Sequence, residues 1–305
     1  MSVDVMNSII MLFGLIAVGY ISNTAGVLDE TANSRFSTFL LKVSLPATIL
    51  DSAISQEAVE QAAVIRLIFT AVGVFILVPF FSKIIVSRFH LDAACELMLN
   101  YSNLGFMGFP IIASVYGEEY VFYAAVFLMV FNVHLFTVGV MTLQGGLGDE
   151  KREGEKPHFW KTLCSPGIAA ALLAFVIVIV KVPIPDFAGK IAASLGAVTT
   201  PLAMVVIGSQ LAQVEILQSL KNPKLYLIAL FKLIIYPSAV YLILLMIMGN
   251  GMIPKIAAVL TGLPVAGNVT MLCQEYGGDV ALAAQGTCVT ALLSLLTVPV
   301  MLSIL

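Results

Sequence analysis

The chain has 305 residues, of which 60% are hydrophobic and only 11% are charged, and its mean hydropathy is +1.02. A water-soluble domain needs far more polar surface than this composition supplies, so the sequence indicates an integral membrane protein. The net charge of −3 is spread over short connecting segments, with no basic patch or polybasic tail. We therefore expect no nucleic-acid partner.

Ten apolar segments are each close to the roughly 20 residues that a helix needs to cross the bilayer core. The first of them begins without a positively charged stretch, since the first basic residue is Arg35, and this favours a membrane helix over a cleaved signal peptide. In chain order, the predicted helices cover residues 5–24, 33–53, 62–86, 94–115, 119–143, 162–182, 188–213, 225–249, 254–275 and 279–304.

The polar segment 145–161, GGLGDEKREGEKPHFWK, divides these helices into two groups of five. The excess of basic residues on its side of the membrane places this linker in the cytoplasm and both termini outside. Because each half has an odd number of helices, the second half enters the membrane in the inverted sense. The loops on the linker's side carry Arg35, Lys83, Arg88, Lys151, Arg152, Lys156, Lys161, Lys221 and Lys224, whereas the opposite side carries only Arg66, Lys181, Lys190 and Lys255.

The two halves, 1–144 and 162–305, share the positions of several prolines. The second and seventh predicted helices each have a proline near mid-membrane, Pro46 and Pro201. The third and eighth each have a late proline, Pro79 and Pro237. This pattern favours two inverted repeats joined by the linker 145–161.

The fourth and ninth predicted helices are interrupted by residues that break helices, in NLGFMGFP at 103–110 and GLPVAGNVTM at 262–271. Backbone groups freed in hydrocarbon need partners, so such breaks persist only inside protein or beside a wet cavity. Paired breaks in two inverted halves are typical of a transporter site, and half-helix N-termini favour an anion there. The predicted substrate-binding residues are Asn103, Gly105, Gly108, Pro110, Pro264, Gly267 and Asn268.

The alternative for each break is a kink that serves helix packing alone, because glycine and proline are common in membrane helices. An asparagine beside each break, in matching halves, favours the binding site.

Four ionisable residues are candidates for ion coupling or charge balance, because charge inside a membrane is costly and often functional. Lys42 could offset an anionic substrate or extend to the interface, and Asp51 and Glu275 could carry a proton or remain solvated. His134 could relay a proton or be a hydrogen-bonded core residue. Lys232 lies two turns into its predicted helix, where its side chain could reach out to the interface.

Signatures of catalysis and of metal binding are missing from the sequence. It contains no GxSxG, HExxH or P-loop motif and no pair of intramembrane aspartates, so we do not expect an enzyme. Cys95, Cys164, Cys273 and Cys288 have no CxxC or metal-ligand spacing, and we expect no disulfide, metal or cofactor. A membrane sensor that binds a ligand without transporting it stays open as an alternative.

The sequence resembles the auxin efflux carrier family, which includes plant PIN-formed auxin carriers and bacterial malate permeases. The resemblance covers the whole chain and rests on SLPATIL, NLGFMGFPII, TTPLAMVVIGSQLA, FKLIIYP and GLPVAGNVTMLCQEYG. It implies an elevator-type transporter with the fold of the bile-acid symporters, in which helices 4 and 9 unwind and cross around the substrate carboxylate.

Carried onto this chain, the resemblance implies that Asn103 with residues 105–110 forms one arm of the site and residues 264–268 the other. Helices 1, 2, 6 and 7 would form a scaffold, helices 3–5 and 8–10 a moving transport domain, and two copies a homodimer. The sodium-binding acidic residues of the bile-acid symporters have no evident counterpart; Glu275 is the only nearby candidate. Sodium coupling is therefore kept only as an alternative.

Together these observations predict an all-α integral membrane protein with ten helices in a five-plus-five inverted repeat. We expect a multi-pass protein of the bacterial inner membrane that transports small organic anions, for example dicarboxylates such as malate. Coupling, where present, would be to protons or to the membrane potential.

Overall fold

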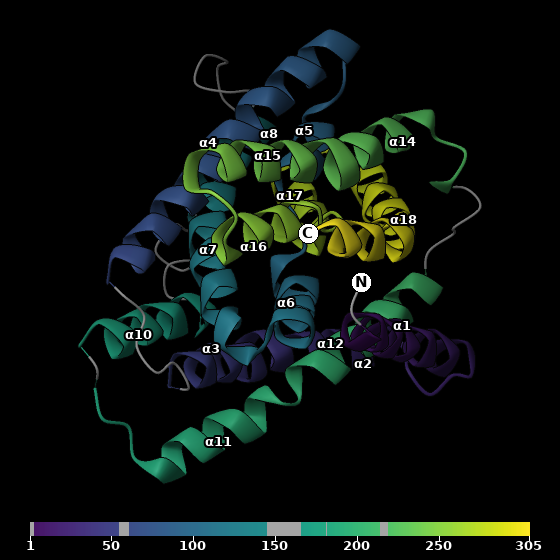
Figure 1. Cartoon of the computed structure of the whole chain (residues 1–305). Helices are drawn as coiled ribbons and strands as arrows, with labels where there is room; N and C mark the ends of the chain where they lie inside the picture. Colours follow the sequence, from purple (N-terminus) through teal and green to yellow (C-terminus); the bar gives the residue numbers. More distant parts are fainter. Residues whose placement is uncertain (1–2, 55–60, 145–165, 181, 214–218) are drawn as a thin grey trace. The chain divides into compact units, whose positions relative to one another are not determined.

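The computed structural model describes residues 3–54, 61–144, 166–180, 182–213 and 219–305 (Figure 1). Within these residues all regular structure is helical, apart from one isolated bridge between Ser102 and Val265. The predicted all-α class is therefore confirmed. The predicted linker 145–161 and Cys164 lie outside the described residues.

Several helical segments of the described chain are long and apolar enough to cross a membrane. There are six of these, namely Glu30–Ile54, Ala63–Phe89, Glu118–Leu143, Asp186–Ala212, Pro223–Met248 and Val280–Ile304. Shorter apolar helices occur at Ile10–Thr24, Leu104–Tyr116 and Met252–Thr261. All nine segments fall on helices predicted from the sequence, and their number and composition indicate a multi-pass membrane protein.

The chain divides into two compact units. Unit 1 comprises Met1–Ile68, Leu104–Met129 and Leu163–Val214, and unit 2 comprises Phe69–Asn103, Val130–Thr162 and Glu215–Leu305. Both units therefore draw on both halves of the sequence. The helices α4 (Gln61–Phe89) and α7 (Val121–His134) each begin in unit 1 and end in unit 2.

In unit 1, α1 (Val3–Thr24) packs along α12 (Thr199–Ala212). Glycine makes this close approach possible, since a Cβ atom at Gly19 would collide with the backbone of Val205 and one at Gly208 with the carbonyl of Ile16. Near the end of α1, Asn23 donates a hydrogen bond of 3.0 Å to Ser209 of α12. The pair is thus held by backbone proximity and by one polar contact.

The rest of unit 1 packs around α3 (Leu45–Ile54), which lies against α10 (Pro166–Val180) and α11 (Asp186–Gly196). A break in the helical path separates α11 from α12, and buried hydroxyls fill it. Ser44 donates to the carbonyl of Leu195 at 2.9 Å, and the hydroxyls of Ser44 and Thr48 lie 2.5 and 2.7 Å from that of Thr199. The contact from Ser44 satisfies a carbonyl group that the end of α11 leaves without a partner in the helix, and the hydroxyl contacts join α3 and η1 to the start of α12. The remaining described helices of unit 1 are α2 (Glu30–Phe39), α6 (Phe109–Tyr116) and the 3-10 turn η3 (Glu118–Tyr120).

Three prolines are each preceded by a short π-helical turn. The turns η1 (Leu40–Ser44), η2 (Leu104–Gly108) and η5 (Phe231–Ile235) end two residues before Pro46, Pro110 and Pro237. A proline ring clashes with the carbonyl four residues earlier, which in each case lies inside the turn. Widening the helix there relieves the clash while the helical path continues.

In unit 2, the short helix α5 (Ala93–Asn100) is buried from Ala94 to Asn100. It packs against α8 (Val140–Leu143), α14 (Pro223–Leu230), η5, α17 (Gly267–Tyr276) and α18 (Val280–Ile304). The unit also contains the π-helical turn η4 (Leu135–Gly139) and the neighbouring helices α15 (Tyr236–Met248) and α16 (Met252–Thr261). The helices α14 to α18 are the green-to-yellow part of Figure 1.

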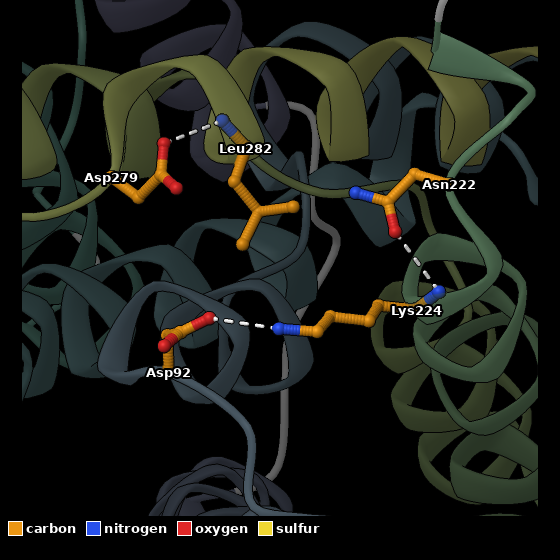
Figure 2. A network of polar contacts seen from close by, with 5 residues as sticks. All are labelled: Asp92, Asn222, Lys224, Asp279 and Leu282. Carbon is orange, nitrogen blue, oxygen red and sulfur yellow. Dashed lines mark hydrogen bonds and ion pairs between the residues drawn. The ribbon is translucent and has the colours of Figure 1, made fainter.

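Polar contacts fix the first turns of α5, α14 and α18 (Figure 2). Lys224 of α14 forms an ion pair of 3.3 Å with Asp92, which precedes α5. Asn222 accepts a hydrogen bond from the backbone of Lys224, and Asp279 accepts one from the backbone of Leu282. Asn222 and Asp279 are therefore N-caps, which satisfy amide groups at the starts of α14 and α18.

Candidate functional site

The non-helical segments at the two breaks lie against each other inside unit 2. Helix α5 ends at Asn100 and α16 ends at Thr261, and the non-helical segments that follow are paired antiparallel at Ser102 and Val265. The amide of Asn103 donates to the carbonyl of Pro264 at 2.8 Å, and the amide of Ala266 donates to the carbonyl of Tyr101 at 3.0 Å. Each segment thus supplies the backbone partners that the other segment needs in an apolar interior.

We call residues 101–103 and 262–266 together the crossing. Side-chain hydroxyl groups add further hydrogen bonds to it. Ser102 donates to the carbonyl of Thr261 at 2.9 Å, and the amide of Val265 donates to the hydroxyl of Thr290 at 3.0 Å. Thr290 in turn donates to the carbonyl of Gly286 within α18. Ser102, Val265 and Thr290 are all buried, so the crossing belongs to the core of unit 2.

The first break begins earlier than its glycines suggest. Its extended residues are Tyr101 to Asn103, whereas Gly105 and Gly108 lie in η2 and Pro110 lies in the first turn of α6, where proline is well tolerated. The extended conformation is held by hydrogen bonds to the second break and not by the freedom of glycine. Asn103 consequently belongs to unit 2, while Gly105, Gly108 and Pro110 belong to unit 1.

The second break follows the prediction closely. Pro264 lies in the extended segment and Gly267 begins α17, with Asn268 as its second residue. No side chain caps this helix, and its N-cap residue Ala266 is only 4% exposed. The first amide groups of a helix have no acceptor within the helix, and their partial positive charge attracts anions.

Space is available beside these amides. A Cβ atom built on Gly267 would meet no described heavy atom within 4 Å, and Asn268 is half-buried. An uncapped helix N-terminus with room beside it and an amide side chain on its first turn can accept a small carboxylate. Among the described residues no three His, Cys, Asp or Glu side chains gather as a metal site would require.

Lys232 of η5 is fully buried and donates to the carbonyl of Leu99 at 2.9 Å. The interpretation that its side chain extends to the membrane interface is therefore wrong. The ammonium lies at the C-terminal end of α5, where the partial charge of the helix is negative. Tertiary packing of η5 against α5 holds it there, which the sequence alone could not reveal.

His134 lies next to the crossing through Tyr101. The Tyr101 hydroxyl is 2.8 Å from Nδ1 of His134, and the two rings contact those of Phe131 and Phe75. The half-buried histidine is thus hydrogen-bonded within an aromatic cluster. Its part in proton movement stays a prediction.

The other predicted coupling residues are not part of this cluster in unit 2. Lys42 is exposed in η1 and Asp51 is half-buried in α3, and both belong to unit 1. Glu275 lies in α17 close to its end, but its side chain lies outside the described part of the structure.

The sequence interpretation missed two residues of α5, Glu96 and Asn100. They are 7% and 4% exposed, and both are polar in an otherwise apolar environment. A signal was present, since the run CELMLN places a carboxylate and an amide one helical turn apart just before a break.

The fold and the site define a class of protein: a multi-pass, all-helical membrane protein in which two broken helices meet in a buried crossing. The chain belongs to the membrane transport protein family, the family of the auxin efflux carriers, whose sequence model matches residues 4–302. This match confirms the resemblance seen in the sequence motifs.

Individual relatives agree with this assignment. A protein of Rhizobium meliloti strain 1021 named "Putative malonate transporter" is 28% identical over 318 residues, covering 97% of this chain and 94% of that protein. An uncharacterized transporter of Methanocaldococcus jannaschii is 23% identical over 308 residues, covering 96% of each chain. An uncharacterized transporter of Escherichia coli K12 is 25% identical over 179 residues, covering 56% and 57% of the two chains. The family and these relatives point to transport.

Proposed function

We propose that the protein is a secondary transporter of small organic anions, with dicarboxylates such as malate and malonate as the first candidate substrates. The observation that carries this proposal is the uncapped N-terminus of α17 at the crossing, with open space at Gly267. A carboxylate bound there would accept hydrogen bonds from backbone amides and from the Asn268 side chain. The name of the Rhizobium relative supports a dicarboxylate.

In this proposal the binding site is the crossing of the fourth and ninth predicted helices. Asn103 and Asn268 supply side-chain amides, and Pro264 keeps the segment before α17 extended because it fixes φ and lacks an amide hydrogen. Gly105, Gly108 and Pro110 shape the segment that follows Asn103. A site made mostly of backbone dipoles suits a carrier, since it binds its substrate without a fixed counter-ion and can release it again.

The proposed architecture is a ten-helix inverted repeat in the bacterial inner membrane, with both termini outside and two copies in a dimer. The first, second, sixth and seventh helices predicted from the sequence form the proposed scaffold. The third to fifth and the eighth to tenth predicted helices move against it. The two compact units support part of this division, since unit 1 contains the four proposed scaffold helices. Residues 104–129 also belong to unit 1, whereas the proposal assigns them to the moving part.

The experiment that tests the site is counterflow of labelled malate and malonate into liposomes that contain the purified protein. Replacing Asn268 by alanine should weaken exchange of whichever anion is carried, because one amide donor is lost. The matched control is Asn250→Ala, which changes an exposed asparagine in the turn between α15 and α16 of the same unit. Equal exchange by the two variants would place the substrate elsewhere.

The second candidate function is that of a ligand sensor without transport. It would show saturable binding of the anion with no exchange across the membrane. Exchange that saturates with substrate concentration excludes it.

A further inference from the structure

Two polar side chains lie buried one helical turn apart on α5. Glu96 is 7% exposed and Asn100 is 4% exposed, within a helix that is buried at every position from Ala94 onward. Residues four apart project from the same face of a helix, so the carboxylate and the amide share one side of α5. Neither residue is needed to close the crossing, whose hydrogen bonds are made by other groups.

These side chains have atoms without partners. Among the described residues, no hydrogen-bond partner is within reach of Oε1 of Glu96 or of Nδ2 and Oδ1 of Asn100. Buried polar groups are nearly always hydrogen-bonded, and a buried carboxylate is costly unless it is paired or neutralised. Inside a membrane protein, ionisable residues of this kind mark ion pathways and proton relays.

The cations around α5 have other partners or lie further off. Lys224 pairs with Asp92 at the start of α5 (Figure 2), and Lys232 donates to the carbonyl of Leu99. Neither forms an ion pair with Glu96 among the described residues. Lys83 of α4, which is exposed, is the cation whose charge acts on the Glu96 carboxylate. The other titratable groups of unit 2 on or next to the elements around α5 are Cys95, Tyr101, His134, Tyr226, Tyr236, Cys273, Tyr276, Cys288 and Asp279, with the side chain of Glu275 outside the described part.

We propose that Glu96, with Asn100 beside it, is the site of the cation that is co-transported with the anion, and that this cation is a proton. The inference rests on the proposed transport function. A proton from water on one side of the membrane binds a carboxylate oxygen of Glu96, which becomes a neutral carboxyl group, and it leaves to water on the other side. The amide oxygen of Asn100 is placed to accept a hydrogen bond from that carboxyl group after a side-chain rotation.

The small number of oxygen ligands favours a proton over a metal cation. Glu96 and Asn100 offer two orphan oxygens, Oε1 and Oδ1, whereas hard cations are held by larger sets of oxygen ligands. A proton needs only the carboxylate itself and one acceptor.

The position of α5 links the proton to the anion. Asn100 is followed by Tyr101, whose carbonyl accepts the amide of Ala266, the residue immediately before α17. With a rise of about 1.5 Å per residue, Glu96 lies roughly 7.5 Å along the helix from the crossing. A negative charge on Glu96 disfavours an anion at the N-terminus of α17, so protonation of Glu96 favours substrate binding. Because the two sites are linked, anion binding becomes tighter as the pH falls. We expect the affinity for the anion to change by about tenfold, which is within the usual range of such couplings.

The test compares two transport measurements on the same liposomes: anion exchange across a range of equal internal and external pH, and uptake driven by an inward proton gradient. The wild type should exchange faster as the pH falls and should be stimulated by the gradient. In Glu96→Gln, the pH dependence of exchange and the stimulation should both be lost. The matched control is Glu30→Gln, an exposed glutamate at the start of α2, which should behave as the wild type does. A Glu96→Gln protein that still responds to the proton gradient overturns the proposal, as does stimulation by a sodium gradient without a proton gradient.

An infrared measurement separates this inference from the transport function itself. Difference spectra between low and high pH should contain the C=O stretching band of a buried protonated carboxyl group. The band should vanish in Glu96→Gln, persist in Glu30→Gln and shift in Glu96→Asp. The aspartate variant keeps the test decisive if the glutamine variant fails to fold. If the wild type carries no anion, the transport proposal fails while the band still decides the proton site. Absence of the band from the wild type overturns the site.

Discussion

At the residue scale, the hydroxyl of Thr290 connects α18 to the crossing. It accepts the amide of Val265 and donates to the carbonyl of Gly286, so one side chain satisfies a backbone group that the break leaves without a helical partner. In an apolar interior the loss of such an acceptor is costly because no water replaces it.

Replacing Thr290 by valine keeps the shape of the side chain but leaves the amide of Val265 without its acceptor. We expect the free energy of unfolding to fall by about 1–3 kcal/mol. Thermal unfolding in detergent measures the change. The control is Thr287→Val in the same helix, since that hydroxyl donates only to the carbonyl of Ala283 within α18. Equal effects of the two substitutions would mean that Thr290 does not support the crossing.

Gly267 offers a second test at this scale. A methyl group there meets no described atom within 4 Å, so Gly267→Ala should fold normally, and alanine should slightly favour α17. The same methyl group would occupy the proposed substrate space. We expect the KM of counterflow to rise about tenfold, which corresponds to a loss of roughly 1.4 kcal/mol of binding free energy.

The matched control for this change is Gly251→Ala, because Gly251 also has nothing within 4 Å but precedes α16, at the end opposite the crossing. An unchanged KM in Gly267→Ala would show that the substrate does not approach the first turn of α17.

At the element scale, the helix pair α1–α12 depends on small residues. A Cβ atom on Gly208 would overlap the backbone carbonyl of Ile16, and a backbone atom cannot rotate away as a side chain can. Gly208→Ala should therefore force the helices apart and lower the free energy of unfolding by about 1–3 kcal/mol.

The control is Gly14→Ala in α1, where an added Cβ meets no described atom within 4 Å. It should leave the thermal unfolding temperature unchanged or raise it slightly. A tolerated Gly208→Ala would contradict the close packing of α1 on α12.

Elements were predictable from the sequence to different degrees. The apolar runs gave the positions of the membrane helices, because their length is set by the bilayer and their ends by charged residues. Pro46, Pro110 and Pro237 predict where the helices are distorted, and a π-helical turn precedes each of them. The sequence indicates a kink at these prolines, but it does not reveal that the distortion is a π-helical turn. The start of the first break could not be read, since it is fixed by hydrogen bonds to Pro264 and Ala266, roughly 160 residues further along the chain.

At the scale of the whole molecule, the two units cannot be read from the order of the chain. Each unit combines segments of both halves, so proximity along the sequence does not indicate which helices share a core. The paired breaks are visible in the sequence as motifs, and in the structure their non-helical segments are joined by the bridge at Ser102 and Val265. The burial of Glu96, Asn100 and Lys232 was not visible, because it depends on the helices that close around α5.

The central claim is that this molecule carries small organic anions across a membrane. The most direct test measures binding and flux on one preparation: equilibrium binding of labelled malonate and malate to the purified protein, and counterflow of the same anions in liposomes. We predict that at least one anion both binds saturably and exchanges, with exchange competed by the unlabelled anion. Saturable binding without any exchange would contradict the claim and would identify a membrane sensor instead.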